Sequence, residues 1–180
     1  MVGQLTQYFV AATLDGFIAD EDDNLDWLLS MPGGDDEANP YSRFIEEVGA
    51  VAMGAATYEW VLAHDDGPWP YDQPTWVFTH RELPVRDGSD IRFTSAPVPD
   101  VHAEMLAAAG TRNVWLVGGG DLVGQFLDHD LLDEIWLGLT PVVLGSGKPL
   151  LPRRRTAPMR LLSVTPSPAD TFVHLRYSLR

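Results

Sequence analysis

Three consecutive glycines, Gly118, Gly119 and Gly120, are the residues of this chain best suited to holding a ligand. They follow the apolar run 114–117, which is typical of a strand buried on both faces, and they precede Asp121, a residue type that often begins a helix. At such a junction the bare backbone can approach a ligand, and free helical N–H groups attract an anion. The spacing indicates a phosphate site, with an ordinary tight turn as the alternative.

Two other strand ends carry groups that suit a phosphate. Gly54 ends an apolar run and Thr57 places a hydroxyl at the start of the following helix, which repeats the arrangement at the triple glycine. Thr79, His80 and Arg81 end a later apolar run, and a guanidinium is suited to two-point contacts with phosphate. The alternative for these three residues is an ordinary polar strand end.

The sequence contains no recognisable group of side chains that could catalyse a reaction without a cofactor. The chain has no cysteine, and its five histidines are scattered at positions 64, 80, 102, 129 and 174. The acidic stretch 20–26 resembles a calcium loop, but Leu25 stands where that loop needs glycine. We therefore expect no metal site, and we expect a bound cofactor to supply the chemistry.

Composition limits the class of protein. A chain of 180 residues with 45% hydrophobic content predicts one domain spanning residues 1–180. A formal charge of −14 disfavours nucleic acid and anionic membrane surfaces as partners. No apolar run approaches the ~20 residues of a membrane span. We expect a cytoplasmic protein that acts on a small molecule.

Apolar runs alternate with helical patterns, which predicts an open, largely parallel α/β sheet covered on both faces. Strands are expected at 7–12, 50–53, 75–79, 91–94, 114–117, 135–143, 159–165 and 171–179. A helix is expected from Asn39, with Phe44 and Val48 on one face and Gly49 as its end. The last two strands are joined by a proline-containing turn, so they should form an antiparallel edge.

Four blocks carry a resemblance to a known family. They are ATLDGFIA (12–19), VAMGAATYEW (51–60), VWLVGGGDLVGQFL (114–127) and LLDEIWLGLTPVVLGSGKPLL (131–151). In this order they resemble the dihydrofolate reductase superfamily, and within it the reductase domain of the riboflavin-biosynthesis deaminase-reductase group. The resemblance implies a three-layer αβα fold with a mixed, mostly parallel sheet and antiparallel C-terminal strands. It also implies NADPH lying across the carboxyl ends of the strands.

The resemblance further implies which residues meet each part of NADPH, and a cis peptide bond between Gly118 and Gly119. The nicotinamide would face Ala11, Ile18 and Ala19. The pyrophosphate would lie between Gly54 and Thr57 on one side and Gly118, Gly119, Gly120, Asp121, Leu122 and Val123 on the other. The adenosine ribose and its 2′-phosphate would meet Thr79, His80 and Arg81.

The chain departs from the family's folate-using members at the substrate. Those members carry a carboxylate on the first helix and a threonine on the strand after the Asp-Glu pair, and here these places hold Pro40 and Gly138. Dihydrofolate is therefore not the expected substrate. The arginine that usually clamps the cofactor is replaced by Ala55, which leaves Arg81 alone for the 2′-phosphate and leaves the choice between NADPH and NADH open.

The expected function is reduction by NADPH of a small pyrimidine-like, pterin-like or carbonyl substrate. Trp27, Phe44 and Val48 would be pocket walls, Gly138 would lie beside the substrate, and Asp15 would be a polar contact or proton relay. Pyrimidine reduction in riboflavin synthesis is a narrower form, although we expect a free-standing relative because no deaminase signature precedes the domain. The rival is a non-catalytic NADP-binding protein.

Self-association is also expected. Val173, Leu175 and Tyr177 alternate with polar residues along the last strand, which leaves one apolar row to cover. We expect a homodimer.

Overall fold

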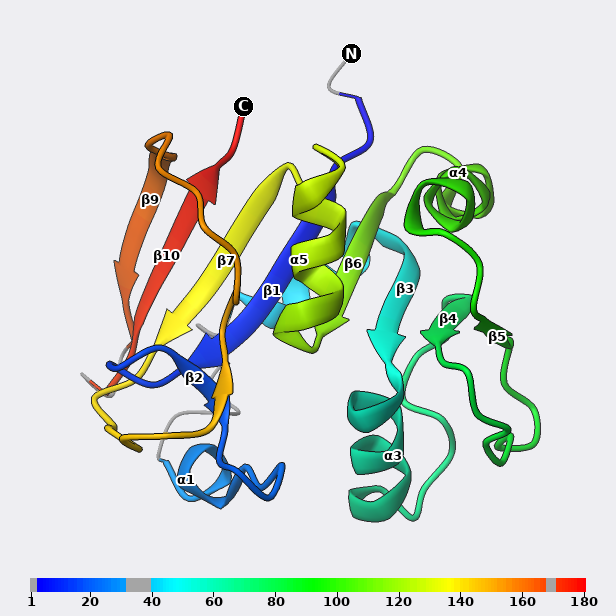
Figure 1. Cartoon of the computed structure of the whole chain (residues 1–180), viewed down its shortest axis with the longest axis horizontal. Coiled ribbons are helices and arrows are strands. Elements are labelled where there is room, and N and C mark those ends of the chain that lie inside the picture. Colours follow the sequence, from blue (N-terminus) through cyan, green and yellow to red (C-terminus); the bar gives the residue numbers. More distant parts are fainter. Residues whose placement is uncertain (1–2, 32–39, 168–170) are drawn as a thin grey trace.

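An eight-stranded mixed sheet forms the centre of the computed structural model, which describes residues 3–31, 40–167 and 171–180 (Figure 1). The strand order is β5-β4-β3-β6-β1-β7-β10-β9. All neighbours are parallel up to β7, whereas β10 is antiparallel to both β7 and β9. The strands are β1 (Thr6–Ala12), β3 (Val48–Gly54), β4 (Thr75–Phe78), β5 (Ile91–Thr94), β6 (Asn113–Gly118), β7 (Glu134–Leu139), β9 (Arg160–Pro166) and β10 (Val173–Ser178). The expected sheet with its antiparallel C-terminal strands is confirmed.

Helices cover both faces of the sheet, which gives three layers. Successive strand residues point to opposite faces, so Ala50 and Ala52 pack on the side of α4 (Val98–Ala109) and α5 (Gly120–Asp128). Val51 and Met53 pack on the side of α2 (Tyr41–Glu46) and α3 (Ala55–His64). None of the helices in the described residues has the length and apolar character that crossing a bilayer requires.

A short antiparallel pair lies beside the sheet. It joins β2 (Phe17–Ala19) to β8 (Lys148–Pro149), and α1 (Asp26–Leu29) follows β2. A Cβ on Gly147 would collide with the backbone oxygen of Ala19, so glycine allows this loop to pack against β2.

The boundary between α2 and β3 differs from the expectation. The helix ends at Glu46, and both Val48 and Gly49 already belong to β3. Gly49 is needed for close packing, because a Cβ there would lie 2.5 Å from the backbone oxygen of Ala109 at the end of α4. The expected helix start at Asn39 lies outside the described residues.

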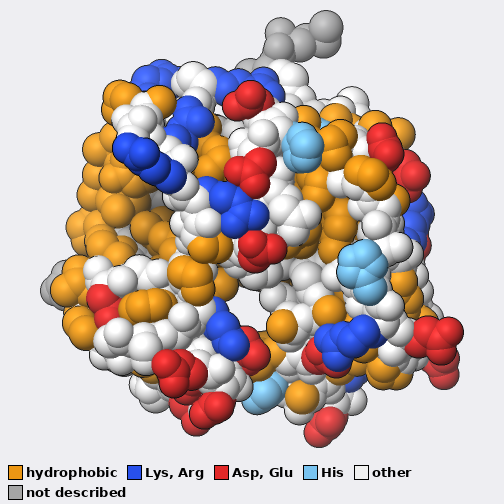
Figure 2. Space-filling model, in the orientation of Figure 1, with side chains coloured by type: hydrophobic (Ala, Val, Ile, Leu, Met, Phe, Trp, Pro, Cys, Tyr) orange, Lys and Arg blue, Asp and Glu red, His pale blue; other side chains and the backbone are white. Residues whose placement is uncertain are grey.

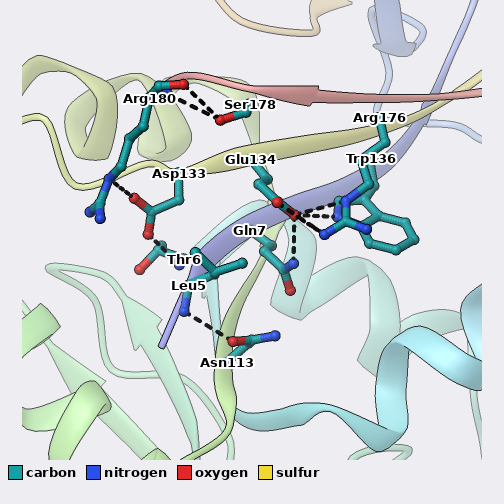
Figure 3. Close-up of polar contacts among 10 residues, drawn as sticks. All are labelled: Leu5, Thr6, Gln7, Asn113, Asp133, Glu134, Trp136, Arg176, Ser178 and Arg180. Carbon is teal, nitrogen blue, oxygen red and sulfur yellow. Dashed lines mark hydrogen bonds and ion pairs between the residues drawn. The ribbon is translucent and has the colours of Figure 1, made fainter. Parts of the chain in front are cut away.

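A buried carboxylate ties together the three strands at the parallel-to-antiparallel switch (Figure 3). Glu134 of β7 accepts hydrogen bonds from Gln7 of β1 at 2.8 Å and from Trp136 at 3.0 Å. Arg176 of β10 donates two more bonds to it, both at 3.0 Å. Its neighbour Asp133 accepts the backbone N–H of Thr6 at 2.8 Å. The Asp-Glu pair therefore fixes the sheet rather than contributing to the ligand site.

Candidate functional site

A cleft of about 530 Å³ opens at the carboxyl ends of β1, β3 and β6. Figure 2 shows the corresponding hollow, between the regions of α1 and α3 in Figure 1. Most of its lining is apolar or bare backbone, which is typical of sites for cofactors and small molecules. The expected site residues that line it are Ala11, Ile18, Ala19, Thr57, Gly118, Gly119, Gly120 and Asp121.

The two glycine junctions meet at this cleft. A Cβ on Gly54 would lie 3.8 Å from the backbone nitrogen of Gly119, and one on Gly118 would lie 3.6 Å from the Thr57 hydroxyl oxygen. The peptide bond between Gly118 and Gly119 is cis, as expected. The first turns of α3 and α5 thus begin side by side, and their unbonded N–H groups form a single place for an anion.

The residues from Gly119 to Val123 differ in their surroundings. A Cβ on Gly119 would meet nothing within 4 Å, so this position is open space, whereas one on Gly120 would lie 2.6 Å from the backbone oxygen of Leu150. Leu122 and Val123 were expected to cover the cofactor, but their side chains lie in the core. The N–H of Val123 donates to the Gly119 oxygen at 3.2 Å, so it is not free for a ligand.

Two cations near the cleft are held by carboxylates. Lys148 lies 3.6 Å from Asp23, and both line the cleft. Arg153 pairs with Asp121 at 3.1 Å and with Asp128 at 2.8 Å. The charge of Asp121, which would otherwise oppose a phosphate at the start of α5, is therefore compensated.

The expected contacts of the adenosine half lie outside the lining of the cleft. Thr79, His80 and Arg81 are exposed or half-buried and follow β4, whose last residue, Phe78, pairs with Gly54 in the sheet. The Thr79 hydroxyl accepts the backbone N–H of Arg81 at 3.0 Å. The guanidinium of Arg81 donates to Glu59 of α3 at 3.0 and 2.6 Å.

Three expected pocket walls do not line the cleft. Phe44 and Val48 are 2% and 0% exposed and belong to the core on the side of α2 and α3, so their assignment as walls is corrected. Both residues are apolar and the sequence cannot distinguish a core position from a wall. Trp27 lies on α1 outside the lining, and its buried indole N–H has no hydrogen-bond partner among the described residues.

The carboxylate of Asp15 links two loops. It accepts the Thr13 hydroxyl at 2.6 Å and the backbone N–H of Gly145 at 2.7 Å, which ties the turn after β1 to the loop before β8. The Thr13 hydrogen bond, followed by those from Gly145 and Leu144, holds the pKa of Asp15 below its usual value. A carboxylate that is kept ionised and already bonded is poorly suited to relay protons, and Asp15 does not line the cleft. Its role as a polar contact to the substrate stays a prediction.

Gly138 lines a second cavity, of about 80 Å³, on the face of the sheet that carries His174 and Arg176. A Cβ on Gly138 would lie 3.7 Å from Nδ1 of His174 and 3.8 Å from the Cα of Ala11. Gly138 is therefore next to β1 but does not line the main cleft.

Sequence reasoning missed an aromatic wall of the cleft. Trp115 packs edge-on against Tyr41 and Tyr71, with ring centroids 5.7 and 5.4 Å apart, and Phe9 lies 5.9 Å from Tyr41. Burial raises the pKa of Tyr41 and of Tyr71, so both phenols remain protonated. Trp60 of α3 lines another part of the cleft. No motif marks these residues, because they come from distant segments and read as core.

A metal centre is not evident in the described ranges. Nowhere in them do three or more histidine, aspartate or glutamate side chains gather closely enough to hold an ion. The described lining of the cleft offers helix N-termini, bare backbone, aromatic rings, the hydroxyls of Thr57, Tyr41 and Tyr71, and the Lys148–Asp23 ion pair.

The chain matches the family described as the RibD C-terminal domain over residues 68–173. It is 37% identical over 146 residues to the uncharacterized protein YwjB of Bacillus subtilis strain 168, covering 81% of each chain. A solved structure from Shewanella sp. PV-4, named for riboflavin biosynthesis, is 28% identical, with a TM-score of 0.84 over 98% of this chain and 100% of that one.

Two more distant structures share the fold. The deaminase/5-amino-6-(5-phosphoribosylamino)uracil reductase of Thermotoga maritima has a TM-score of 0.70 at 18% identity, over 98% of this chain and 56% of that one. Dihydrofolate reductase of Enterococcus faecalis in complex with NADP(H) has a TM-score of 0.67 at 17% identity, over 97% and 95%. With its dihydrofolate reductase-like fold, the chain belongs to the RibD C-terminal domain family.

Proposed function

We propose that the protein is a reductase that uses NADPH to reduce a small heteroaromatic, pyrimidine-like or pterin-like, or carbonyl substrate. The observation that carries the proposal is the meeting of Gly54 and Gly118 at one cleft, where the first turns of α3 and α5 begin together. Because the chain has a formal charge of −14, a bound phosphate needs such local donors.

The groups present fit a dinucleotide. The Thr57 hydroxyl lines the cleft next to Gly118 and can donate to a pyrophosphate oxygen, while Gly119 leaves room for close approach. Ala11, Ile18 and Ala19 offer a small apolar surface to a flat ring. NADPH, when bound, supplies the hydride. The aromatic wall of the same cleft would orient the substrate and exclude water.

Few side chains in the described lining of the cleft could supply a proton to the reduced product. In the described lining, Tyr41 and Tyr71 carry phenol groups whose pKa is raised by burial, and a protonated phenol can donate a hydrogen bond to a reduced product. We infer that the proton reaches the product from water or from one of these donors.

The test combines binding with turnover. NADPH fluorescence should change saturably on titration with protein, and NADPH should be oxidised with at least one member of a panel of pterins, pyrimidines, quinones and aldehydes. Saturable binding with no oxidation by any panel member would favour the rival, a non-catalytic NADP-binding protein. The absence of binding would refute both.

A further inference from the structure

The hydroxyl of Tyr71 is a polar group of the aromatic wall that has no hydrogen-bond partner in the described protein. Tyr71 lies in the loop between α3 and β4, is partly buried and lines the cleft. Among the residues that the structure describes, none forms a hydrogen bond with its hydroxyl. A ligand that fills the cleft displaces water from this hydroxyl, so the ligand must supply a new hydrogen-bond partner.

Neighbouring indoles fix the orientation of the Tyr71 ring. It packs edge-on against Trp69 and Trp115, with ring centroids 5.4 Å apart in both pairs and interplanar angles of 80° and 90°. Both tryptophans are largely buried, and Nε1 of Trp115 already donates to the backbone oxygen of Phe9 at 3.3 Å. The Tyr71 hydroxyl is therefore held in place before a ligand arrives, which lowers the entropy cost of bonding to it.

The surroundings of Tyr71 make its hydroxyl a hydrogen-bond donor and a poor acid. Burial is the main reason that the pKa of Tyr71 is raised, and Tyr41 and Asp65 act in the same direction. The phenol is therefore protonated at neutral pH. Such a group can donate a hydrogen bond to a substrate oxygen or nitrogen that gains negative charge during reduction. The proton that completes the reduction would then come from water.

The carboxylates in the described lining of the cleft are already paired. Asp23 lies 3.6 Å from Lys148, and Asp121 lies 3.1 Å from Arg153. An amino group on a bound ring therefore meets no unpaired carboxylate in this part of the lining, whereas a carbonyl oxygen can accept from Tyr71. The phenol oxygen could also accept from an amino group, but such a bond is weaker than one to a carboxylate. The aromatic wall thus favours a ring that presents an acceptor.

We propose, building on the reductase function above, that Tyr71 determines specificity by donating a hydrogen bond to an acceptor atom on the planar ring of the substrate. The ring lies against Tyr41 and Trp115, and its acceptor atom faces the Tyr71 hydroxyl. A ring that presents an amino group at this point leaves the hydroxyl proton unpaired and binds more weakly.

Two pteridines with the same ring system test the proposal: lumazine, which is the 2,4-dioxo compound, and 2,4-diaminopteridine. Each is titrated into the protein by calorimetry at neutral pH, with and without saturating NADP⁺. Lumazine should bind at least about fivefold more tightly than the diamine, because a hydrogen bond of this kind contributes about 1 kcal/mol. Equal or tighter binding of the diamine, or binding of neither compound, would overturn the proposal.

A tyrosine-to-phenylalanine pair locates the effect. Tyr71→Phe keeps the ring and removes the hydroxyl, so it should weaken lumazine binding about fivefold and change the affinity for the diamine by less than about twofold. Tyr177→Phe is the matched control, because Tyr177 lies on β10 outside the lining of the cleft, and it should leave both affinities unchanged. Equal weakening of both pteridines in Tyr71→Phe would show that the packing of the ring, not the hydroxyl, selects the ligand.

The same titrations separate this proposal from the reductase function. Tyr71→Phe should bind NADPH as tightly as the wild-type protein. If the preference for lumazine depends on Tyr71 but NADPH does not bind, the role of Tyr71 is supported and the reductase function is refuted. If NADPH binds and Tyr71→Phe leaves lumazine affinity unchanged, the role of Tyr71 is refuted and the reductase function remains.

Discussion

Glu59 of α3 holds the guanidinium of Arg81 in a two-point ion pair, with nitrogen–oxygen distances of 3.0 and 2.6 Å. Arg81 is the residue proposed to meet the 2′-phosphate of NADPH. The pair is exposed, so it contributes little to stability, but it competes with a phosphate for the same donors. Glu59 should therefore weaken the preference for NADPH over NADH.

Replacing Glu59 tests this competition. In Glu59→Gln, the dissociation constant for NADPH should fall about two- to fivefold relative to that for NADH, because an exposed pair of this kind is worth less than about 1 kcal/mol. Arg81→Gln should shift the ratio in the opposite direction. Asp90→Asn is the matched control, because it breaks the exposed pair with Arg92 on β5. Ratios that stay unchanged in both Glu59→Gln and Arg81→Gln would exclude Arg81 from the 2′-phosphate site.

Acid should destabilise the fold through His102. Burial is the main reason that its pKa lies below the usual value, with Arg180 acting in the same direction and Asp133 opposing it. The folded state thus binds fewer protons than the unfolded state, so this contribution is fully present above the unfolded pKa of about 6.5 and is lost as pH falls below it. His174, whose pKa burial also lowers, acts in the same window.

Urea unfolding at a series of pH values measures this contribution. His102→Gln should flatten the decline in the free energy of unfolding below neutral pH, and His174 should account for part of the remaining slope. The exposed His129→Gln serves as the control and should reproduce the wild-type slope. A His102→Gln profile parallel to that of wild type would show that His102 is not the linked group.

The Glu134 network should dominate the polar contribution to stability. Glu134→Gln removes the negative charge of the carboxylate to which Arg176, Gln7 and Trp136 donate hydrogen bonds. The substitution should lower the free energy of unfolding by about 2 kcal/mol. Glu59→Gln breaks an exposed pair and should cost less than about 1 kcal/mol. Equal losses in the two variants would show that burial does not strengthen the network.

An exposed apolar sheet face should mediate self-association, as the sequence led us to expect. Leu161 and Val164 of β9 are 51% and 53% exposed and pair with Tyr177 and Leu175 of β10. None of the described helices covers this part of the sheet in Figure 1, and Figure 2 shows hydrophobic surface over it. The apolar row on β10 therefore continues onto the edge strand.

Light scattering after gel filtration tests the proposed homodimer. The wild-type protein should have twice the chain mass of 19.9 kDa, and Leu161→Asp with Val164→Asp should have the mass of one chain. Val85→Asp introduces a charge at another exposed valine, 56% accessible, and should not change the mass. A wild-type mass of one chain would refute the dimer.

The two glycine-containing junctions of the site could be predicted from the sequence. A glycine directly after a buried strand usually marks a turn or a place where the backbone closely approaches another group. The junctions at Gly54 and Gly118 were predicted separately, and the parallel sheet brings them together. The predicted end of the second helix was wrong, because Phe44, Ile45 and Val48 also fit helical spacing. In the structure the strand already includes Val48 and Gly49, and Gly49 packs closely against Ala109.

Side-chain contacts between distant segments could not be predicted. The aromatic wall assembles Phe9, Tyr41, Tyr71 and Trp115 from β1, α2, the loop after α3 and β6, and each reads as an ordinary core residue. The pairing of Glu59 with Arg81 likewise depends on how α3 lies beside the end of β4. Such contacts depend on tertiary packing, which local spacing does not encode.

NADPH titration of the wild-type protein beside Gly119→Val tests the central claim most directly. A Cβ at Gly119 meets nothing within 4 Å and Gly119 lines the cleft, so an added side chain should occupy space that the cofactor needs. The account predicts saturable binding to the wild-type protein and at least about tenfold weaker binding to the variant, a loss of about 1.4 kcal/mol. Equal affinities, or no saturable binding to the wild-type protein, would contradict it.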